Sequence, residues 1–189
     1  MSQIIDPQEK LQQWVLENTP EVADSSKIYG AISVGDQEGR IEARNRIDRF
    51  HEALEEISTG NEVAELNDNG LKEYIVGGAY IRELFMPAGM FIVSRIWKQS
   101  RFWIVPFGEM TFTTEMGTQR IAGPYRGELL PGSKAAIYTH QDTLIFAITI
   151  VTGTKSQHLS EMEDEVTTMD YRDCEYQWNY LEGGDLWHG

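Results

Sequence analysis

The stretch that decides the fold runs from Ala79 to Thr152 and reads A-Y-I-R-E-L-F-M-P-A-G-M-F-I-V-S-R-I-W-K-Q-S-R-F-W-I-V-P-F-G-E-M-T-F-T-T-E-M-G-T-Q-R-I-A-G-P-Y-R-G-E-L-L-P-G-S-K-A-A-I-Y-T-H-Q-D-T-L-I-F-A-I-T-I-V-T. Short apolar, β-branched and aromatic runs are interrupted in it by Pro and Gly. Short strands with turn signals about every 8 to 12 residues are typical of an all-β sandwich or barrel. We therefore predict a mainly β fold, a small jelly-roll sandwich or barrel.

Within this core we expect strands over residues 80–85, 90–97, 102–105, 110–114, 118–121, 135–139 and 144–151. Turn signals such as Pro87-Ala88-Gly89 and Pro131-Gly132 separate them. The flanking segments differ in composition from the core. We divide the chain into an N-terminal helical arm and linker (1–78), the jelly-roll core (79–152) and a C-terminal acidic, aromatic arm (153–189).

The N-terminal arm is predicted to contain two helices. Asp6-Pro7 supplies an N-cap residue and a proline at the first helical position, so a helix should begin there and end near Asn18. Residues 40–58 carry apolar side chains at helical spacing and should form the longest helix. Between these helices, the alternation over residues 28–34 would fit one edge strand.

The C-terminal arm combines a helix signal with an unusual aromatic content. Ser160 and Glu163 have the spacing of a capping box, so a short helix should begin at Ser160. Residues 170–189 are rich in Tyr, Trp and acids, which is too aromatic for a purely solvating tail. We expect this segment to order against its own sheet or a neighbouring subunit.

The charge is strongly negative and unevenly distributed. Asp and Glu number 30 against 16 Lys and Arg, for a net charge of -14. The excess lies in the two arms, whereas residues 79–152 are mildly basic. Because phosphate neutralisation dominates nucleic-acid binding, this balance argues against a nucleic-acid partner. The acidic arms would either solvate the protein or meet a basic protein surface.

The sequence also argues against membrane and secreted classes. No apolar run approaches the ~20 residues of a membrane span, and the start M-S-Q-I-I-D-P lacks the features of a signal peptide. We expect a soluble protein made inside the cell, with no membrane partner. The single cysteine, Cys174, permits neither an internal disulfide nor an all-cysteine metal site, so packing must stabilise the fold.

Two segments carry a resemblance to a known family. These are P-A-G-M-F-I-V-S-R-I-W-K-Q-S-R-F-W-I-V-P-F-G-E at residues 87–109 and P-G-S-K-A-A-I-Y-T-H-Q-D-T-L at residues 131–144. They resemble the cupin superfamily and look most like the small cupin-type proteins encoded by tailed bacteriophages. The resemblance implies a cupin-like jelly roll and a phage context.

The resemblance also implies where a metal would be bound. Metal-binding cupins hold their ion through histidines and a carboxylate, and the matched positions here, aligned on Gly108, are Trp97, Gln99, Arg101 and Ala135 or Ala136. None of these side chains is a good metal ligand, since a metal site needs three or four N, O or S donors. We predict no metal and no cofactor.

Two sets of charged residues are further candidates for a functional site, and each also has a purely structural interpretation. Glu115 with His140 could form an acid/base pair, or both could be turn residues at the ends of two strands. Lys98, Arg101 and Arg120 could converge on an anion in the barrel mouth, or form surface salt bridges.

Three aromatic side chains carry a similar pair of alternatives. Trp97, Phe102 and Trp103 could line a ligand pocket or fill the barrel interior. With Gln99, Arg101 and Tyr138, Trp97 makes up the ligand-binding set that we predict for the barrel mouth. No catalytic residues are assigned.

Three functional hypotheses follow. The first is a non-enzymatic, metal-free, virion-associated structural or assembly protein of a tailed phage, located in the virion or host cytoplasm. Its partners would be other virion proteins and its own copies, most simply in a dimer. The second is a binding module for a small anionic ligand, and the third is a cupin-type isomerase or dioxygenase with a rebuilt site. We favour a protein that is not an enzyme.

Overall fold

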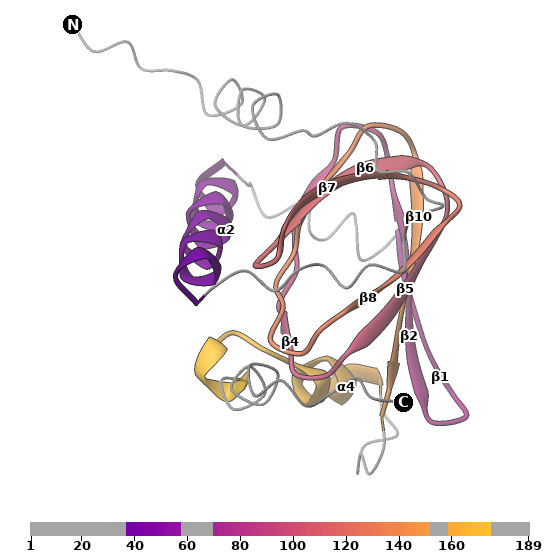
Figure 1. The fold of residues 1–189 in the computed structure, drawn as a ribbon. Helices are drawn as coiled ribbons and strands as arrows, with labels where there is room; N and C mark the ends of the chain where they lie inside the picture. The colour runs from indigo at the N-terminus through magenta and orange to yellow at the C-terminus, as the bar shows by residue number, and fades with distance from the viewer. Residues whose placement is uncertain (1–36, 58–69, 152–158, 175–189) are drawn as a thin grey trace, which may run out of the picture.

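The computed structural model describes residues 37–57, 70–151 and 159–174. These residues form a sandwich of two antiparallel sheets, with one long helix against one sheet and a shorter helix at one end (Figure 1). The predicted mainly β, jelly-roll fold is confirmed. The helix expected over 7–18, the strand expected over 28–34 and the part of the C-terminal arm beyond residue 174 lie outside the described residues.

The larger sheet has five strands in the order β1-β2-β10-β5-β8. Their bounds are Leu71–Val76, Ala79–Met86, Thr143–Ile150, Arg101–Phe107 and Tyr125–Leu129. Neighbours distant in sequence, such as β2 and β10, pair antiparallel, as in a jelly roll. The sheet includes β1, which precedes residue 79, and β8, which no predicted strand covered. Gly127 weakens the strand signal of β8, yet a Cβ there would lie 2.9 Å from Nε1 of Trp103.

The smaller sheet has four strands in the order β3-β9-β6-β7. Their bounds are Phe91–Val93, Ala136–Thr139, Glu109–Thr114 and Gly117–Ala122. The strand predicted over 90–97 is wrong as one piece. The pairing of β3 with β9 ends at Val93, and a separate strand, β4 (Ile96–Trp97), follows after two residues. At the break, the Ser94 hydroxyl donates to the carbonyl of Arg95 and accepts from the amide of Ala135, while the Ser94 amide still donates to the carbonyl of Ala135, so a side chain supplies one of the two hydrogen bonds between these residues.

The main core lies between the two sheets. Trp103 on β5 is central, with ring centroids 4.7 Å from Phe112 and 5.6 Å from Tyr125, both in edge-on geometry. Around these rings lie the other buried members of the core: Met86, Val105, Met110, Ile121, Leu129 and Ile145. Side chains alternate in and out along each strand, which fixes which residues face the space between the sheets.

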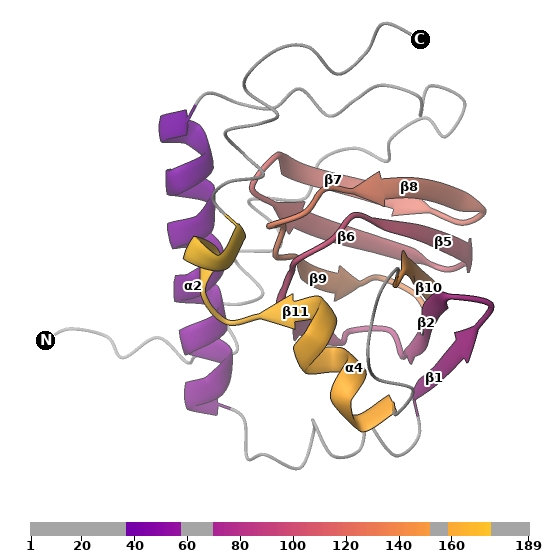
Figure 2. The same ribbon diagram turned by 90° about the horizontal axis from the view of Figure 1, so that it is seen from below.

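Helix α2, Gln37–Ile57, packs against the outer side of the four-stranded sheet (Figures 1 and 2). Its buried residues Ile47 and Phe50 contact Ala136, and the Phe50 ring lies 5.6 Å from that of Phe91. An ion pair between Asp48 and Nζ of Lys134, at 2.8 Å, adds to this contact. The helix predicted over 40–58 is confirmed.

Helix α4, Leu159–Val166, crosses one end of the sandwich (Figure 1). Its buried residues Met162 and Val166 pack with Tyr80 and Trp97, which confirms the helix predicted near Ser160. The chain then forms β11 (Thr167–Thr168), which pairs with β4, and the 3-10 helix η2 (Tyr171–Cys174), whose Cys174 is buried and free. Within the described ranges, no helix has both the length and the apolar character to cross a membrane.

Candidate functional site

A cavity of about 220 Å³ lies between the two sheets, at the end that α4 crosses. Most of its walls are apolar, from the inner faces of both sheets. Its polar and charged lining consists of Arg82 on β2, Ser94 and Arg95 beside β4, Arg101 on β5 and Glu163 on α4. Three arginines and one glutamate therefore face a small, mainly apolar space.

Arg101 is the most buried of these charges. It begins β5 on the inner face of the sheet and is 4% exposed. Its guanidinium carbon lies 4.7 Å from the centre of the Trp97 ring, a cation–π contact. Its Nη1 is buried and has no hydrogen-bond partner within the described part of the chain. A buried, underpaired guanidinium is costly for the protein alone and becomes favourable once an anion meets it.

Burial also shifts the protonation of this group. The pKa of Arg101 is lowered to about 9, mainly by removal from water; the charge of Glu115 opposes this shift and that of Arg82 adds to it. At neutral pH the side chain is still protonated. The cavity therefore holds a positive charge in a region of low dielectric constant, where an anion would be attracted strongly.

Arg82 and Arg95 add two further positive charges to the cavity lining. Nη1 of Arg82 lies 3.2 Å from the carboxylate of Glu163, and Nε of Arg82 lies 3.2 Å from that of Glu73. Nη1 of Arg95 pairs with Asp164 at 2.8 Å, while its Nε is buried without a hydrogen bond from the described residues. Both arginines are thus positioned by acids, and Arg95 retains a buried donor.

Glu163 places a carboxylate among these arginines. It lies 3.2 Å from Arg82 and 4.0 Å from Arg95, and its side chain is 41% exposed. Because Glu163 lines the cavity beside Arg82 and Arg95, an anion bound near these arginines would share the same two cations with it. Glu163 is therefore a built-in competitor for a ligand carboxylate.

The cavity includes some of the residues predicted from the sequence and leaves out others. Trp97 and Arg101 line it, whereas Gln99 and Tyr138 do not. Tyr138 lies on the α2 side of the four-stranded sheet, with its ring 4.4 Å from Phe91. Gln99 lies in the loop between β4 and β5.

The predicted cluster of Lys98, Arg101 and Arg120 does not form. Nζ of Lys98 donates to the backbone carbonyl of Asp164 at 2.9 Å, and Nε of Arg120 donates to Glu109 at 2.6 Å. Lys98 and Arg120 are thus held by local partners, a backbone carbonyl and a carboxylate, and neither lines the cavity. Arg82 and Arg95 take their place beside Arg101.

Glu115 and His140 do not form an acid/base pair. His140 hydrogen-bonds Thr111 through Nε2 at 2.8 Å, near the start of β6, whereas Glu115 follows the end of that strand. Buried Glu115 accepts the backbone N–H of Lys134 at 3.0 Å. Both residues therefore have structural partners at opposite ends of β6, as the alternative interpretation held.

Of the three aromatic candidates, Trp97 and Trp103 are buried and line the cavity, while Phe102 is 43% exposed and points out of the sandwich. The reason is the two-residue period of a strand, which turns Phe102 away from the face that Arg101 and Trp103 share. The same period could have identified Arg82 as a residue on the cavity side of β2, since Tyr80, Arg82, Leu84 and Met86 occupy one face of that strand. No comparable signal exists for Arg95, which lies in the break between β3 and β4.

The residues present do not fit a metal ion. Three of the positions that match cupin metal ligands, Trp97, Arg101 and Ala135, line the cavity. An indole, a guanidinium and a methyl group offer no lone pair to a metal, and the charge of Arg101 would repel a cation. In the ranges that the structure describes, no group of three or more His, Cys, Asp and Glu could hold a metal.

No known family profile and no curated protein matches the sequence. Similar solved structures include a conserved protein of unknown function from Streptococcus pyogenes, with 13% identity over 44% of this chain and 75% of that chain and a TM-score of 0.39. A cupin superfamily protein from Desulfitobacterium hafniense shares 11% identity over 44% of this chain and 79% of that chain, with a TM-score of 0.38. A cupin domain from Schizosaccharomyces pombe shares 13% identity over 52% of this chain and 72% of that chain, also with a TM-score of 0.38.

The strand order and register of the two sheets are those of a cupin-like jelly roll. The similar structures lend no support to the phage affiliation that the sequence resemblance implied. The chemistry available to the site follows from the cavity itself, which joins a buried cation to apolar walls.

Proposed function

We propose that this protein binds a small organic anion in the cavity between its sheets. The observation that carries the proposal is the buried guanidinium of Arg101, which lines the cavity and has an Nη1 without a hydrogen-bond partner within the described residues. An anion that accepts a hydrogen bond from this group would compensate a buried charge. Charge-assisted bonds of this kind are among the stronger hydrogen bonds in proteins.

The shape of the site favours a carboxylate over a spherical anion. Arginine presents its donors in a planar fork that matches a carboxylate, and Trp97 holds one face of the Arg101 fork. The remaining walls include Leu84, Phe112 and Ile145, which would contact an apolar body. At 220 Å³ the space lies below the ~300–1,000 Å³ of drug-sized sites, so the ligand is small.

Binding of benzoate, hexanoate, succinate and inorganic phosphate tests this proposal by calorimetry and thermal shift on the full chain. Benzamide is the control, because it keeps the shape of benzoate and lacks its charge. We expect benzoate or hexanoate to bind and to raise the melting temperature, with benzamide inactive. If no carboxylate binds, or if benzamide binds as well as benzoate, the proposal is wrong.

The earlier hypotheses of a phage structural role and of a cupin-type enzyme remain predictions that rest on the sequence resemblance alone. Mass spectrometry of purified virions would test the first, since a virion component should be present at a stoichiometric copy number. Ligand binding is the proposal that the cavity residues support.

A further inference from the structure

The outer face of the five-stranded sheet is the side turned away from the cavity and the main core. The pairing register assigns its side chains to four rows across the strands. The rows are Phe85-Leu144-Phe107, then Lys72-Glu83-Phe146-Ile104-Arg126, then Tyr74-Ile81-Ile148-Phe102-Glu128, and finally Val76-Ala79-Ile150. Charged residues occur in two of these rows, so the face is predominantly apolar.

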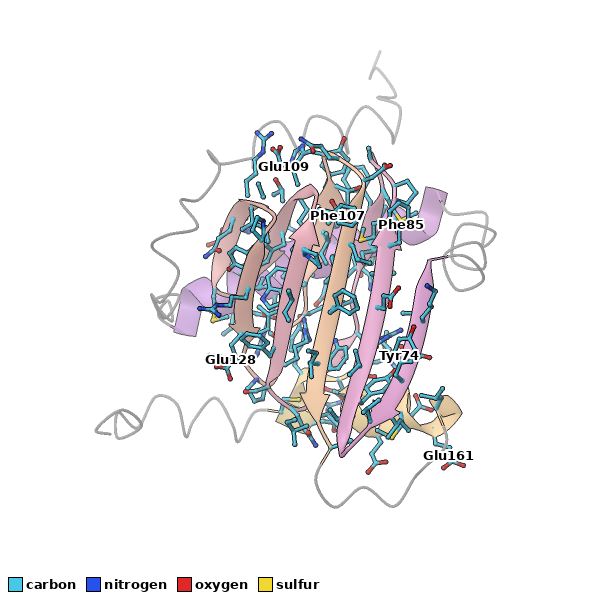
Figure 3. The ribbon with its side chains drawn as sticks, turned by 90° about the vertical axis from the view of Figure 1, so that its right-hand side faces the viewer. Tyr74, Phe85, Phe107, Glu109, Glu128 and Glu161 are labelled. Carbon is cyan, nitrogen blue, oxygen red and sulfur yellow. The ribbon has the colours of Figure 1, made fainter. Side chains whose placement is uncertain are left out.

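Many of these apolar side chains are open to solvent. Tyr74, Val76, Phe85, Phe102, Phe107 and Ile150 are each between 38% and 60% exposed. Figure 3 looks onto this face and shows Phe85 and Phe107 toward one end of it and Tyr74 toward the other. Scattered apolar residues are normal on a protein surface, but a contiguous group over four strands is not.

No helix of the described residues covers this face. Helix α2 lies against the other sheet, and α4 lies across the end of the sandwich (Figures 1 and 3). The two sheets thus differ on their outer faces. A helix packs on that of the four-stranded sheet, whereas that of the five-stranded sheet exposes its apolar side chains to solvent. A sheet face of this composition is stable in water when a second apolar surface covers it.

The charges on the face indicate what that second surface is. Lys72 pairs with Glu83 at 3.1 Å, and Arg126 and Glu128 lie on the edge strand β8, so the four charges sum to zero. The whole chain carries a net charge of -14. Two copies would repel each other over most of their surfaces. They would not do so at this face, where the charges balance and a positive side chain of one copy can pair with a negative side chain of the other.

The exposed area is also of the right size. At ~150–250 Å² for a large side chain, the exposed parts of the six residues amount to roughly 400 to 700 Å² per copy. The largest patch on a typical monomer is about 300–600 Å², whereas a stable interface buries about 800 Å² per partner. The half-buried residues between them, such as Ile81 and Phe146, bring the face close to that size.

We propose that the outer face of the five-stranded sheet, centred on Phe102 and Ile148, is the interface between two copies of this chain. A two-fold axis through the face would pack the sheets against each other, with each copy contributing the same rows of side chains. This inference is independent of ligand binding, since the cavity lies on the opposite side of the same strands.

The test is the molar mass of the full chain by light scattering at micromolar concentration, for the wild type and for Phe102→Glu and Phe85→Glu. Each substitution places a charge on an exposed position, so the monomer should still fold. Met169→Glu is the matched control, because Met169 is 63% exposed and lies off this face. We expect a dimer for the wild type and Met169→Glu, and a folded monomer for both phenylalanine variants.

Two results would overturn the proposal. One is a monomeric wild type, which would show that no second copy covers the face. The other is a dimer that persists in both phenylalanine variants with an unchanged dissociation constant, which would place the interface elsewhere. If either phenylalanine variant fails to fold, Val76→Lys, at the edge of the same face, gives an independent reading.

Discussion

The guanidinium of Arg101 lies over the ring of Trp97, 4.7 Å from its centre, inside the protein. Trp97 is held in turn by Tyr80, whose ring centroid is 6.5 Å away. The cation is thus stabilised in part by an aromatic face, which contacts it without occupying all its donors. This arrangement explains how a buried arginine can be retained and still have a donor available to a ligand.

Replacing Arg101 should separate binding from stability. We expect Arg101→Met to weaken benzoate binding by about tenfold or more, because a charge-assisted hydrogen bond is lost. The same change should raise the free energy of unfolding by about 1–4 kcal/mol, because a buried charge is replaced by an apolar side chain. Calorimetry and urea denaturation measure the two effects. Arg49→Met, which removes an exposed positive charge from α2, should change neither.

Glu163 should act against an anionic ligand. Glu163→Gln removes the carboxylate that lies 3.2 Å from Arg82, so benzoate should bind more tightly, by about two- to fivefold. Glu161→Gln is the matched control, since it removes an exposed carboxylate from the same helix that does not line the cavity. Equal affinity changes in both variants would show that the effect comes from net charge alone.

Anion binding should depend on pH through Arg101. The ligand prefers the protonated side chain, whose pKa in the free protein is lowered by burial to about 9. Affinity for benzoate should therefore be constant from about pH 6 to 8 and fall as the pH rises through about 9. Calorimetric titrations across this range measure the dependence. A fall in affinity that begins well below pH 8 would assign the binding cation to another group.

Buried Glu115 should make folding stability fall with pH. Burial raises its pKa above the usual 4.5, although hydrogen bonds from its own amide and that of Lys134 oppose the shift. From about pH 4.5 up to the raised pKa, the unfolded state gives up this proton before the folded state does, so stability decreases. Glu115→Gln cannot ionise. Urea denaturation at pH 5 and pH 8 should show a smaller loss of stability for this variant than for the wild type.

Gly108 between β5 and β6 should tolerate no side chain. Its φ is +100°, and an added Cβ would lie 2.5 Å from the carbonyl oxygen of Asp142. Gly89 also has a positive φ, of +82°, but has open space around it. We expect Gly89→Ala to cost about 1–2 kcal/mol from the left-handed backbone alone, and Gly108→Ala to cost clearly more. Equal melting temperatures for the two variants would show that the loop relaxes freely.

The sequence alone determined the class of fold and the positions of several helices and strands. Short apolar, β-branched and aromatic runs between turn signals predicted strands over 80–85 and 144–151, which the structure contains as β2 and β10, and the apolar spacing over 40–58 predicted α2. The spacing of Ser160 and Glu163 predicted α4. These features depend on side-chain periods and capping patterns within a few residues, so they can be found without any tertiary information.

Only the tertiary structure decided which residues make the cavity and which make the outer face. Arg82, Arg95, Arg101 and Glu163 come from β2, a strand break, β5 and α4, and pairing of β2 and β5 with β10 brings Arg82 and Arg101 into one sheet. The two-residue period of a strand predicts that Phe102 and Arg101 face opposite sides of the sheet, but it does not predict which of the two sides faces the protein interior. That choice depends on which strands pair and which sheet α2 covers, and such contacts between distant residues leave no periodic signal in the chain.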